Sequence, residues 1–149
     1  MSSCPKGGLL SGTDRRDKLD GEDGDDEIRG LGGDDEVLWG GSGSDVIYGG
    51  PGDDSLEGGT YWHGGDTYWI RRHEGSKDVH YGGPGSDVLF DKSGGEDVLY
   101  GEDGNDFIDA SGDEQRDKLY CGEGKDKYVA NKLDNVSSSC EVKAPRSNL

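Results

Sequence analysis

An aspartate that recurs about every nine residues is the feature of this sequence with the clearest chemical potential. Residues 40–48 read GGSGSDVIY, residues 49–57 read GGPGDDSLE and residues 82–90 read GGPGSDVLF, with Gly at positions 1, 2 and 4 and Asp at position 6. Glycine permits positive φ angles and close approach of another backbone, so such a turn can direct carbonyl oxygens inward. Turns that offer only oxygens, with one carboxylate each, suit a hard cation and favour calcium over zinc or copper.

The second part of each nonamer predicts a short strand that positions the turn. Positions 7–9 are too few for a helix but sufficient for a strand. Because side chains alternate along a strand, position 8 points to one side and positions 7 and 9 point to the other. The fixed period indicates a repeat architecture in which each strand buries one side chain.

Twelve nonamers can be counted between residues 12 and 129, of which five are close to the consensus and seven are decayed. The count treats Trp39 as an extra residue after the third nonamer. The predicted inward column at position 8 consists of Leu19, Ile28, Val37, Ile47, Leu56, Tyr68, His80, Leu89, Leu99, Ile108, Leu119 and Tyr128.

These motifs resemble the RTX, or haemolysin-type, calcium-binding nonapeptide repeat over about residues 12–129. The resemblance implies an all-β fold, a right-handed parallel β-roll that forms a nonapeptide-repeat solenoid of about six coils. Two nonamers make one coil, repeats n and n+2 stack, and several Ca²⁺ ions bind between their turns. The implied ligands are the position-6 carboxylates and the backbone carbonyls of the GGxGxD turns.

Stacking every second nonamer sorts the candidate metal ligands into two rows. The first row is predicted to contain Asp17, Asp35, Asp54, Asp78, Asp97 and Asp117. The second row is predicted to contain Asp26, Asp45, Asp66, Asp87, Asp106 and Asp126. The second row keeps better turns, so we expect it to bind calcium more fully.

Arg16 and Arg116 precede the aspartates at the two ends of the predicted first row. One hypothesis is that a guanidinium replaces calcium in these end turns and neutralises them. The alternative is that both are solvated surface charges.

Composition restricts the class of protein. The 149 residues carry a formal charge of −17, and only 28% are hydrophobic, which taken alone is typical of a disordered chain. The regular spacing of glycines and carboxylates favours a folded repeat instead. Its core is thin, so metal binding must contribute to the free energy of folding. The acidity argues against nucleic acid and anionic membranes, and no apolar run reaches transmembrane length. We expect a monomer.

The predicted organisation is a lead-in segment 1–11, a β-roll 12–129 with an irregular insert 58–81, a C-terminal cap 130–142 and a tail 143–149. The N-terminal residues lack the apolar core of a signal peptide. A secreted, extracellular location therefore requires a leader that this chain does not contain, or another export signal.

The three cysteines leave two possibilities open. A bridge between Cys121 and Cys140 would join parts of the last coil and would fit an oxidising compartment. The alternative is that both are free, buried thiols. Cys4 lies alone near the start.

The insert 58–81 contains many aromatics and all three histidines, and it allows three interpretations. His63, His73 and His80 lie near Asp66, Glu74 and Asp78 in the sequence, which would permit a zinc site. The insert can also be a bulged coil whose aromatics cover its own surface, or a binding surface.

Position 9 is often aromatic and points outward. Tyr81, Tyr100 and Tyr120, with Trp39 nearby, are predicted on one face, and Tyr48, Trp69 and Phe90 on the other. Such ladders either stabilise the sheets or recognise an extracellular glycan or protein.

No motif of a hydrolase, a P-loop or an EF-hand is present, so we expect no enzyme. The sequence predicts an exported calcium-binding protein whose folding Ca²⁺ drives; the alternatives are an adhesive module and a structural spacer.

Overall fold

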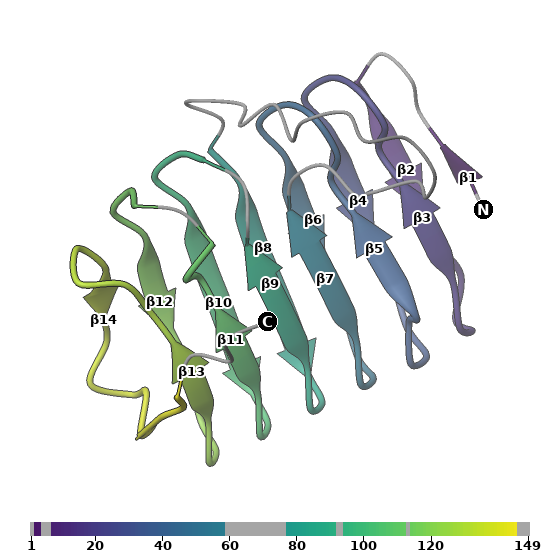
Figure 1. Cartoon of the computed structure of the whole chain (residues 1–149). Helices are drawn as coiled ribbons and strands as arrows, with labels where there is room; N and C mark the ends of the chain where they lie inside the picture. Colours follow the sequence, from purple (N-terminus) through teal and green to yellow (C-terminus); the bar gives the residue numbers. More distant parts are fainter. Residues whose placement is uncertain (1, 4–6, 59–76, 92–93, 113, 146–149) are drawn as a thin grey trace.

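The computed structural model of the chain describes residues 2–3, 7–58, 77–91, 94–112 and 114–145. Its short strands form two parallel sheets, with no helix among the described residues (Figure 1). The eight-stranded sheet contains, in spatial order, β1 (Ser2–Ser3), β3 (Lys18–Asp20), β5 (Val37–Trp39), β7 (Ser55–Gly58), β9 (Val88–Asp91), β11 (Phe107–Asp109), β13 (Lys127–Val129) and β15 (Val142–Lys143). The seven-stranded sheet contains β14 (Asn135–Val136), β12 (Lys118–Tyr120), β10 (Val98–Asp103), β8 (Val79–Pro84), β6 (Val46–Tyr48), β4 (Glu27–Arg29) and β2 (Leu9–Ser11).

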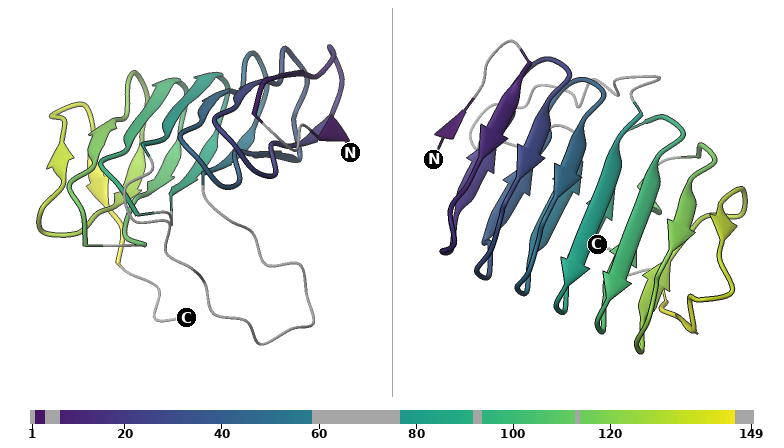
Figure 2. Two further views of the ribbon diagram at one scale, coloured as in Figure 1. Left: turned by 90° about the horizontal axis from the view of Figure 1, so that it is seen from above. Right: turned by 180° about the vertical axis from the view of Figure 1, so that it is seen from behind.

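The chain alternates between the sheets, so that each strand pairs in parallel with the strand two places further along. The two views of Figure 2 show the coils stacked along one axis. The predicted all-β fold, a parallel β-roll of about six coils, is confirmed. The described part of the chain contains no helix that is long and apolar enough to span a membrane.

The inner face of each sheet carries one side chain per strand, because the middle residue of a three-residue strand points inward and its neighbours point outward. The column residues that are at most 5% exposed are Leu10, Leu19, Ile28, Leu38, Ile47, Leu56, His80, Leu89, Leu99, Ile108 and Leu119. The predicted inward position is therefore confirmed for most coils. Tyr128 is partly buried against the same cluster, and Tyr68 lies outside the described residues.

One residue of the predicted column is wrong. Val37 is half-buried, whereas Leu38 is fully buried and pairs in register with Leu19. In the other coils, one residue separates the position-6 aspartate from the inward-pointing residue of the strand, as Lys18 separates Asp17 from Leu19, but here two residues do. The extra residue lies between Asp35 and Leu38, as in a β-bulge, and not at Trp39.

The insert 58–81 changes which coils stack. β6 pairs directly with β8, and β7 pairs directly with β9. In the stack, β8 therefore follows β7 by half a coil. The segment that connects these two strands includes residues 59–76, which lie outside the described residues. Tyr68 and His80 were predicted at the inward positions of two successive stacked nonamers, which is wrong, because only the nonamer of His80 contributes a strand to the described sheets.

Strands extend both ends of the nonamer region. β2 pairs with β4 and buries Leu10, while β14 and β15 pair with β12 and β13. A disulfide joins Cys121 to Cys140, so the bridge predicted as one of two possibilities is present. It connects the turn after β12 to the segment after β14 and constrains the last coil. Cys4 lies outside the described residues.

Four tyrosines form a continuous outward ladder on the seven-stranded sheet, which we call the tyrosine row. The rings of Tyr48, Tyr81, Tyr100 and Tyr120 stack nearly parallel, with 4.9 Å between successive ring centroids. The guanidinium of Arg29 lies 6.0 Å from the ring centroid of Tyr48 and extends the row by one coil.

The predicted distribution of aromatics over the two faces is partly wrong. Tyr48 belongs to the same face as the other three tyrosines because β6 pairs with β8. Trp39 belongs to the opposite sheet, where its Nε1–H donates a 2.7 Å hydrogen bond to Oε2 of Glu57. Phe90 is correctly placed on that sheet and contacts Phe107 edge-on, whereas Trp69 lies outside the described residues.

Candidate metal-binding site

The position-6 aspartates of successive coils lie beside one another in two rows. The backbone N–H of each aspartate donates a hydrogen bond of 2.8–3.2 Å to Oδ1 of the aspartate one coil further along. The Asp54 row consists of Asp17, Asp35, Asp54, Asp87, Asp106 and Asp126. The Asp45 row consists of Asp26, Asp45, Asp78, Asp97, Asp117 and Asp134.

The predicted rows are correct before the insert and exchanged after it. Asp54 donates to Asp87, and Asp45 donates to Asp78, whereas the prediction stacked Asp54 with Asp78. Asp66, which was predicted to follow Asp45, lies outside the described residues. The insert adds one nonamer to the stack instead of two, so every later aspartate belongs to the other row.

Arg16 and Arg116 do not mark the two ends of one row, so the premise of the guanidinium hypothesis is wrong. Asp17 begins the Asp54 row, whereas Asp117 belongs to the Asp45 row. Oδ2 of Asp17 accepts hydrogen bonds from the backbone N–H and the hydroxyl of Thr13. Arg16 is exposed, and its Nε–H donates to a backbone carbonyl of the next coil.

Burial leaves one oxygen of many of these carboxylates without a hydrogen bond. Ten of the twelve aspartates are at most 3% exposed. Their Oδ2 atom is buried and lacks a hydrogen-bond partner in Asp26, Asp35, Asp45, Asp54, Asp87, Asp106 and Asp126. Buried carboxylates are normally paired with a cation or coordinate a metal, because desolvation of an isolated charge is very unfavourable.

These oxygens face a small space beside the first glycine of the turn. A Cβ placed on Gly82 would lie 2.6 Å from Oδ2 of Asp87 and 2.7 Å from the carbonyl oxygen of Gly101 in the next coil. The corresponding oxygens surround the Cβ position of Gly49. Glycine is therefore required at position 1 to keep open the space on which a carboxylate and a carbonyl converge. Such a donor set fits a hard cation such as Ca²⁺.

Several carboxyls of the two rows hold their protons more firmly than isolated carboxyls do. Burial raises the pKa of Asp45 to about 7 and that of Asp87 to about 8, and it raises the pKa of Asp54 and Asp106 to about 6. The hydrogen bond that each accepts from the backbone opposes this shift, and neighbouring carboxylates of the same row add to it. A cation bound in the row would lower these pKa values again, because a nearby positive charge favours the charged form of a carboxyl.

The two rows differ at position 1 of their turns. The Asp54 row has glycine in five successive coils, at Gly12, Gly30, Gly49, Gly82 and Gly101. In the Asp45 row, glycine is present at Gly21, Gly40 and Gly58. Asp91 pairs with Gly58, and Ala110 follows in the next coil. The predicted second row, with its better turns, is divided between the observed rows: Asp26 and Asp45 lie in the Asp45 row, and Asp87, Asp106 and Asp126 lie in the Asp54 row.

Fold and rows together define a class of protein: a β-solenoid with stacked carboxylate turns for metal ions. The family model of the RTX calcium-binding nonapeptide repeat matches the chain in four copies, over residues 9–37, 32–60, 81–114 and 93–128. The chain therefore belongs to the family of RTX calcium-binding nonapeptide repeat proteins, and Ca²⁺ is the ion that its repeats indicate. A comparison with curated proteins found no match.

One acidic residue in the rows and one beside them were not predicted. Asp134 ends the Asp45 row, and the sequence signal was its position two residues before the aliphatic Val136, as Asp117 precedes Leu119. Asp91 lies beside the Asp45 row at the end of β9 and was not among the predicted site residues. Its burial follows from the pairing of β7 with β9, which no local pattern shows.

Proposed function

We propose that this chain is an exported binding module whose folding is driven by Ca²⁺ held between stacked turns. The supporting observation is the set of seven buried aspartates whose Oδ2 atoms have no hydrogen-bond partner. In the absence of a cation, these carboxylates repel one another or must bind protons. An ion that binds the folded rows, but not the unfolded chain, shifts the equilibrium toward the roll.

The proposed ligands are the position-6 carboxylates and the carbonyl oxygens beside the position-1 glycines. The unpartnered Oδ2 atoms favour seven of these aspartates: Asp26, Asp35, Asp45, Asp54, Asp87, Asp106 and Asp126. Asp17, Asp66, Asp78, Asp97 and Asp117 remain predicted ligands.

The proposed place of action is outside the cell. Extracellular calcium modules bind at about 10⁻⁴–10⁻³ M, so a roll of this affinity would fold after export and not before it. We propose a monomer without catalytic activity. The proposed division into lead-in, roll, cap and tail is best examined by limited proteolysis in calcium.

The test is far-UV circular dichroism of the full chain during calcium titration, beginning in chelator. We expect a cooperative increase in β-structure near millimolar Ca²⁺. Mg²⁺ at the same concentration is the matched control and should have little effect, because it requires a tight octahedral shell and retains its waters. A chain that is already fully folded in chelator and does not respond to Ca²⁺ would contradict the proposal. The column, the tyrosine row and the disulfide would then hold the roll.

The tyrosine row supports a second function, adhesion to a glycan or protein. The four stacked rings form a continuous aromatic ladder, and Tyr48 and Tyr120 at its two ends are exposed. Exposed aromatic side chains that gather on one face bind sugar rings or protein partners. A glycan array probed with the calcium-loaded chain tests this function, with Tyr100→Ser as the variant that interrupts the ladder. Absence of binding would favour a structural spacer.

A further inference from the structure

The coil that contains β8 differs from the neighbouring coils in the type of residue at its inward position. His80, in the middle of β8, occupies the place that Ile47 and Leu99 occupy in the adjacent strands of the same sheet. Its side chain is fully buried, and neither ring nitrogen has a hydrogen-bond partner. A buried polar group without a partner is destabilising, so this imidazole in an aliphatic column requires a partner other than a hydrogen-bonding group of the protein.

The same coil also differs from its neighbours at a second position, which lies close to His80. Asp91, the last residue of β9, pairs with Gly58 of β7 and stands where the preceding turns of the Asp45 row have glycine. The Asp91 carboxylate is buried, and its Oδ2 lies 4.0 Å from Nε2 of His80. This separation is too long for a hydrogen bond, but it leaves room for an ion between the two atoms.

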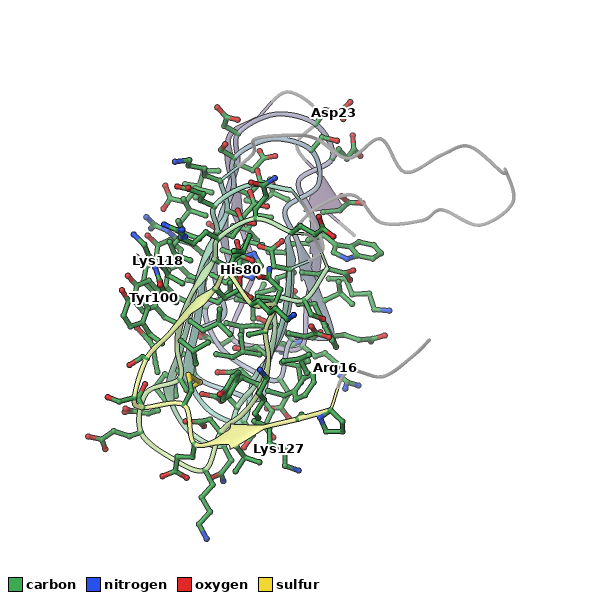
Figure 3. The ribbon with its side chains drawn as sticks, turned by 60° about the vertical axis from the view of Figure 1, so that its left-hand side comes forward. Arg16, Asp23, His80, Tyr100, Lys118 and Lys127 are labelled. Atoms are coloured by element: carbon green, nitrogen blue, oxygen red, sulfur yellow. A yellow bond between two sulfur atoms is a disulfide. The ribbon has the colours of Figure 1, made fainter. Side chains whose placement is uncertain are left out.

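Two further carboxylates reach the same place. Asp78, Asp91 and Asp97 each offer one oxygen, and these three atoms lie within 4.8 Å of one another. A Cβ placed on Gly58 would lie 2.6 Å from Nε2 of His80 and 2.9 Å from Oδ2 of Asp78, so these two atoms face one small space. Figure 3 shows His80 inside the roll, whereas Tyr100 and Lys118 lie at its outer side.

This donor set differs in kind from that of the other turns. His80 offers ring nitrogens, a type of ligand that the carboxylates and carbonyls of the other turns do not provide, and neither of them has a hydrogen-bond partner. Calcium takes oxygen ligands, whereas imidazole together with carboxylates suits zinc and its neighbours in the transition series. Ligands at about 2.0–2.2 Å from one Zn²⁺ ion are roughly 3–4 Å apart. The distance from Nε2 of His80 to Oδ2 of Asp91 is 4.0 Å, and the three carboxylate oxygens are at most 4.8 Å apart.

We propose that His80, Asp78, Asp91 and Asp97 bind one divalent transition-metal ion, represented by Zn²⁺, at one turn of the Asp45 row. Such a site explains both unusual residues of this coil. His80 supplies the nitrogen ligand and Asp91 supplies the additional carboxylate, which together distinguish this site from a calcium turn. The inference goes beyond calcium-driven folding and uses the rows only to place Asp78 and Asp97.

The experiment measures Zn²⁺ binding to the full, calcium-saturated chain by calorimetry, and Co²⁺ binding by its visible absorption. We expect one equivalent per chain and a Co²⁺ spectrum that indicates nitrogen and oxygen ligands. The variants His80→Leu and Asp91→Gly should each lose this equivalent. Both restore the residue type that neighbouring coils use, so they should keep the calcium-induced circular dichroism of the unchanged chain.

The matched control is the double variant His63→Gln, His73→Gln, which removes the other two histidines and should retain the equivalent. Uptake that survives in His80→Leu, or that disappears only in the double variant, would overturn the proposal. So would the absence of Zn²⁺ uptake by the unchanged chain in saturating calcium, since calcium itself would then fill this turn. Zn²⁺ uptake and calcium-driven folding can fail separately, because they are read from different ions and different signals.

Discussion

The Asp54 row and the Asp45 row are built from the same nonamer, but they differ along their length. The Asp54 row keeps glycine at position 1 through five coils, and five of its six aspartates have a buried Oδ2 without a hydrogen-bond partner. In the Asp45 row, only Asp26 and Asp45 have this feature, and both precede the insert. From this comparison we expect that an aspartate at position 6 is not sufficient for a calcium turn, and that an open space beside position 1 also contributes.

The largest expected difference between the rows is in calcium binding. Asp87→Asn, in the Asp54 row, should lower the number of bound calcium ions and reduce the free energy of unfolding in saturating calcium by about 3 kcal/mol, because an ion at 100 times its Kd contributes about 2.7 kcal/mol. Asp117→Asn, in the Asp45 row, should change both quantities much less. Calorimetry and denaturant titration measure them. Equal losses in the two variants would show that the rows are equivalent.

A smaller effect is expected from closing one space without changing a ligand. Gly82→Ala places a Cβ among the oxygens that should hold the ion, so it should weaken calcium binding and destabilise the roll by about 1–3 kcal/mol. Gly32→Ala is the matched control, because the nearest atom to its Cβ would be 3.7 Å away. Both variants are compared by calcium titration with circular dichroism. A Gly82→Ala variant that behaves like Gly32→Ala would refute the role of position 1.

The metal-free roll should become less stable as pH rises. Asp45, Asp54, Asp87 and Asp106 have folded-state pKa values of about 6–8, above the unfolded value of about 4. Between these values the folded chain binds more protons than the unfolded chain, so the free energy of unfolding falls from about pH 4 to pH 8. Circular dichroism in chelator should therefore show more β-structure at pH 5 than at pH 8.

Calcium should reverse this dependence, since protons compete with the ion for the same oxygens. The calcium midpoint should then be higher at pH 5 than at pH 8. Three of the four carboxyls belong to the Asp54 row, so Asp87→Asn should flatten the pH profile. A chelated chain with the same β-content at both pH values would contradict the raised pKa values.

The smallest expected effect is that of substitutions at position 2 of the turn, which should change the stability of the roll equally in the two rows. Leu31 in the Asp54 row and Glu22 in the Asp45 row have φ angles of 81° and 70°, a region unfavourable for side chains. Leu31→Gly and Glu22→Gly should each stabilise the calcium-loaded roll by about 1 kcal/mol or less, because released strain is partly offset by the entropy of glycine. Thermal unfolding of both variants measures this. A stabilisation confined to one row would mean that position 2 also separates them.

The nonamer pattern was sufficient to predict those parts of the fold that depend on residues close together in the sequence. The turn glycines, the aspartate at position 6 and the inward aliphatic residue all lie within nine residues, so the parallel roll and its column could be predicted. Leu38 was missed because an extra residue before the strand and one after it look alike in sequence. The bulge is decided by which choice buries the larger side chain.

The sequence by itself determined the repeat unit, the acidic rows and the kind of ion that suits them, because short-range backbone geometry and residue type suffice for these. Only the tertiary structure decided which aspartates share a row after the insert. That choice depends on β6 pairing with β8 and β7 with β9 across residues whose pattern is irregular. It also brought His80 and Asp91 together, since two residues on different sheets become neighbours only when the coil closes between them.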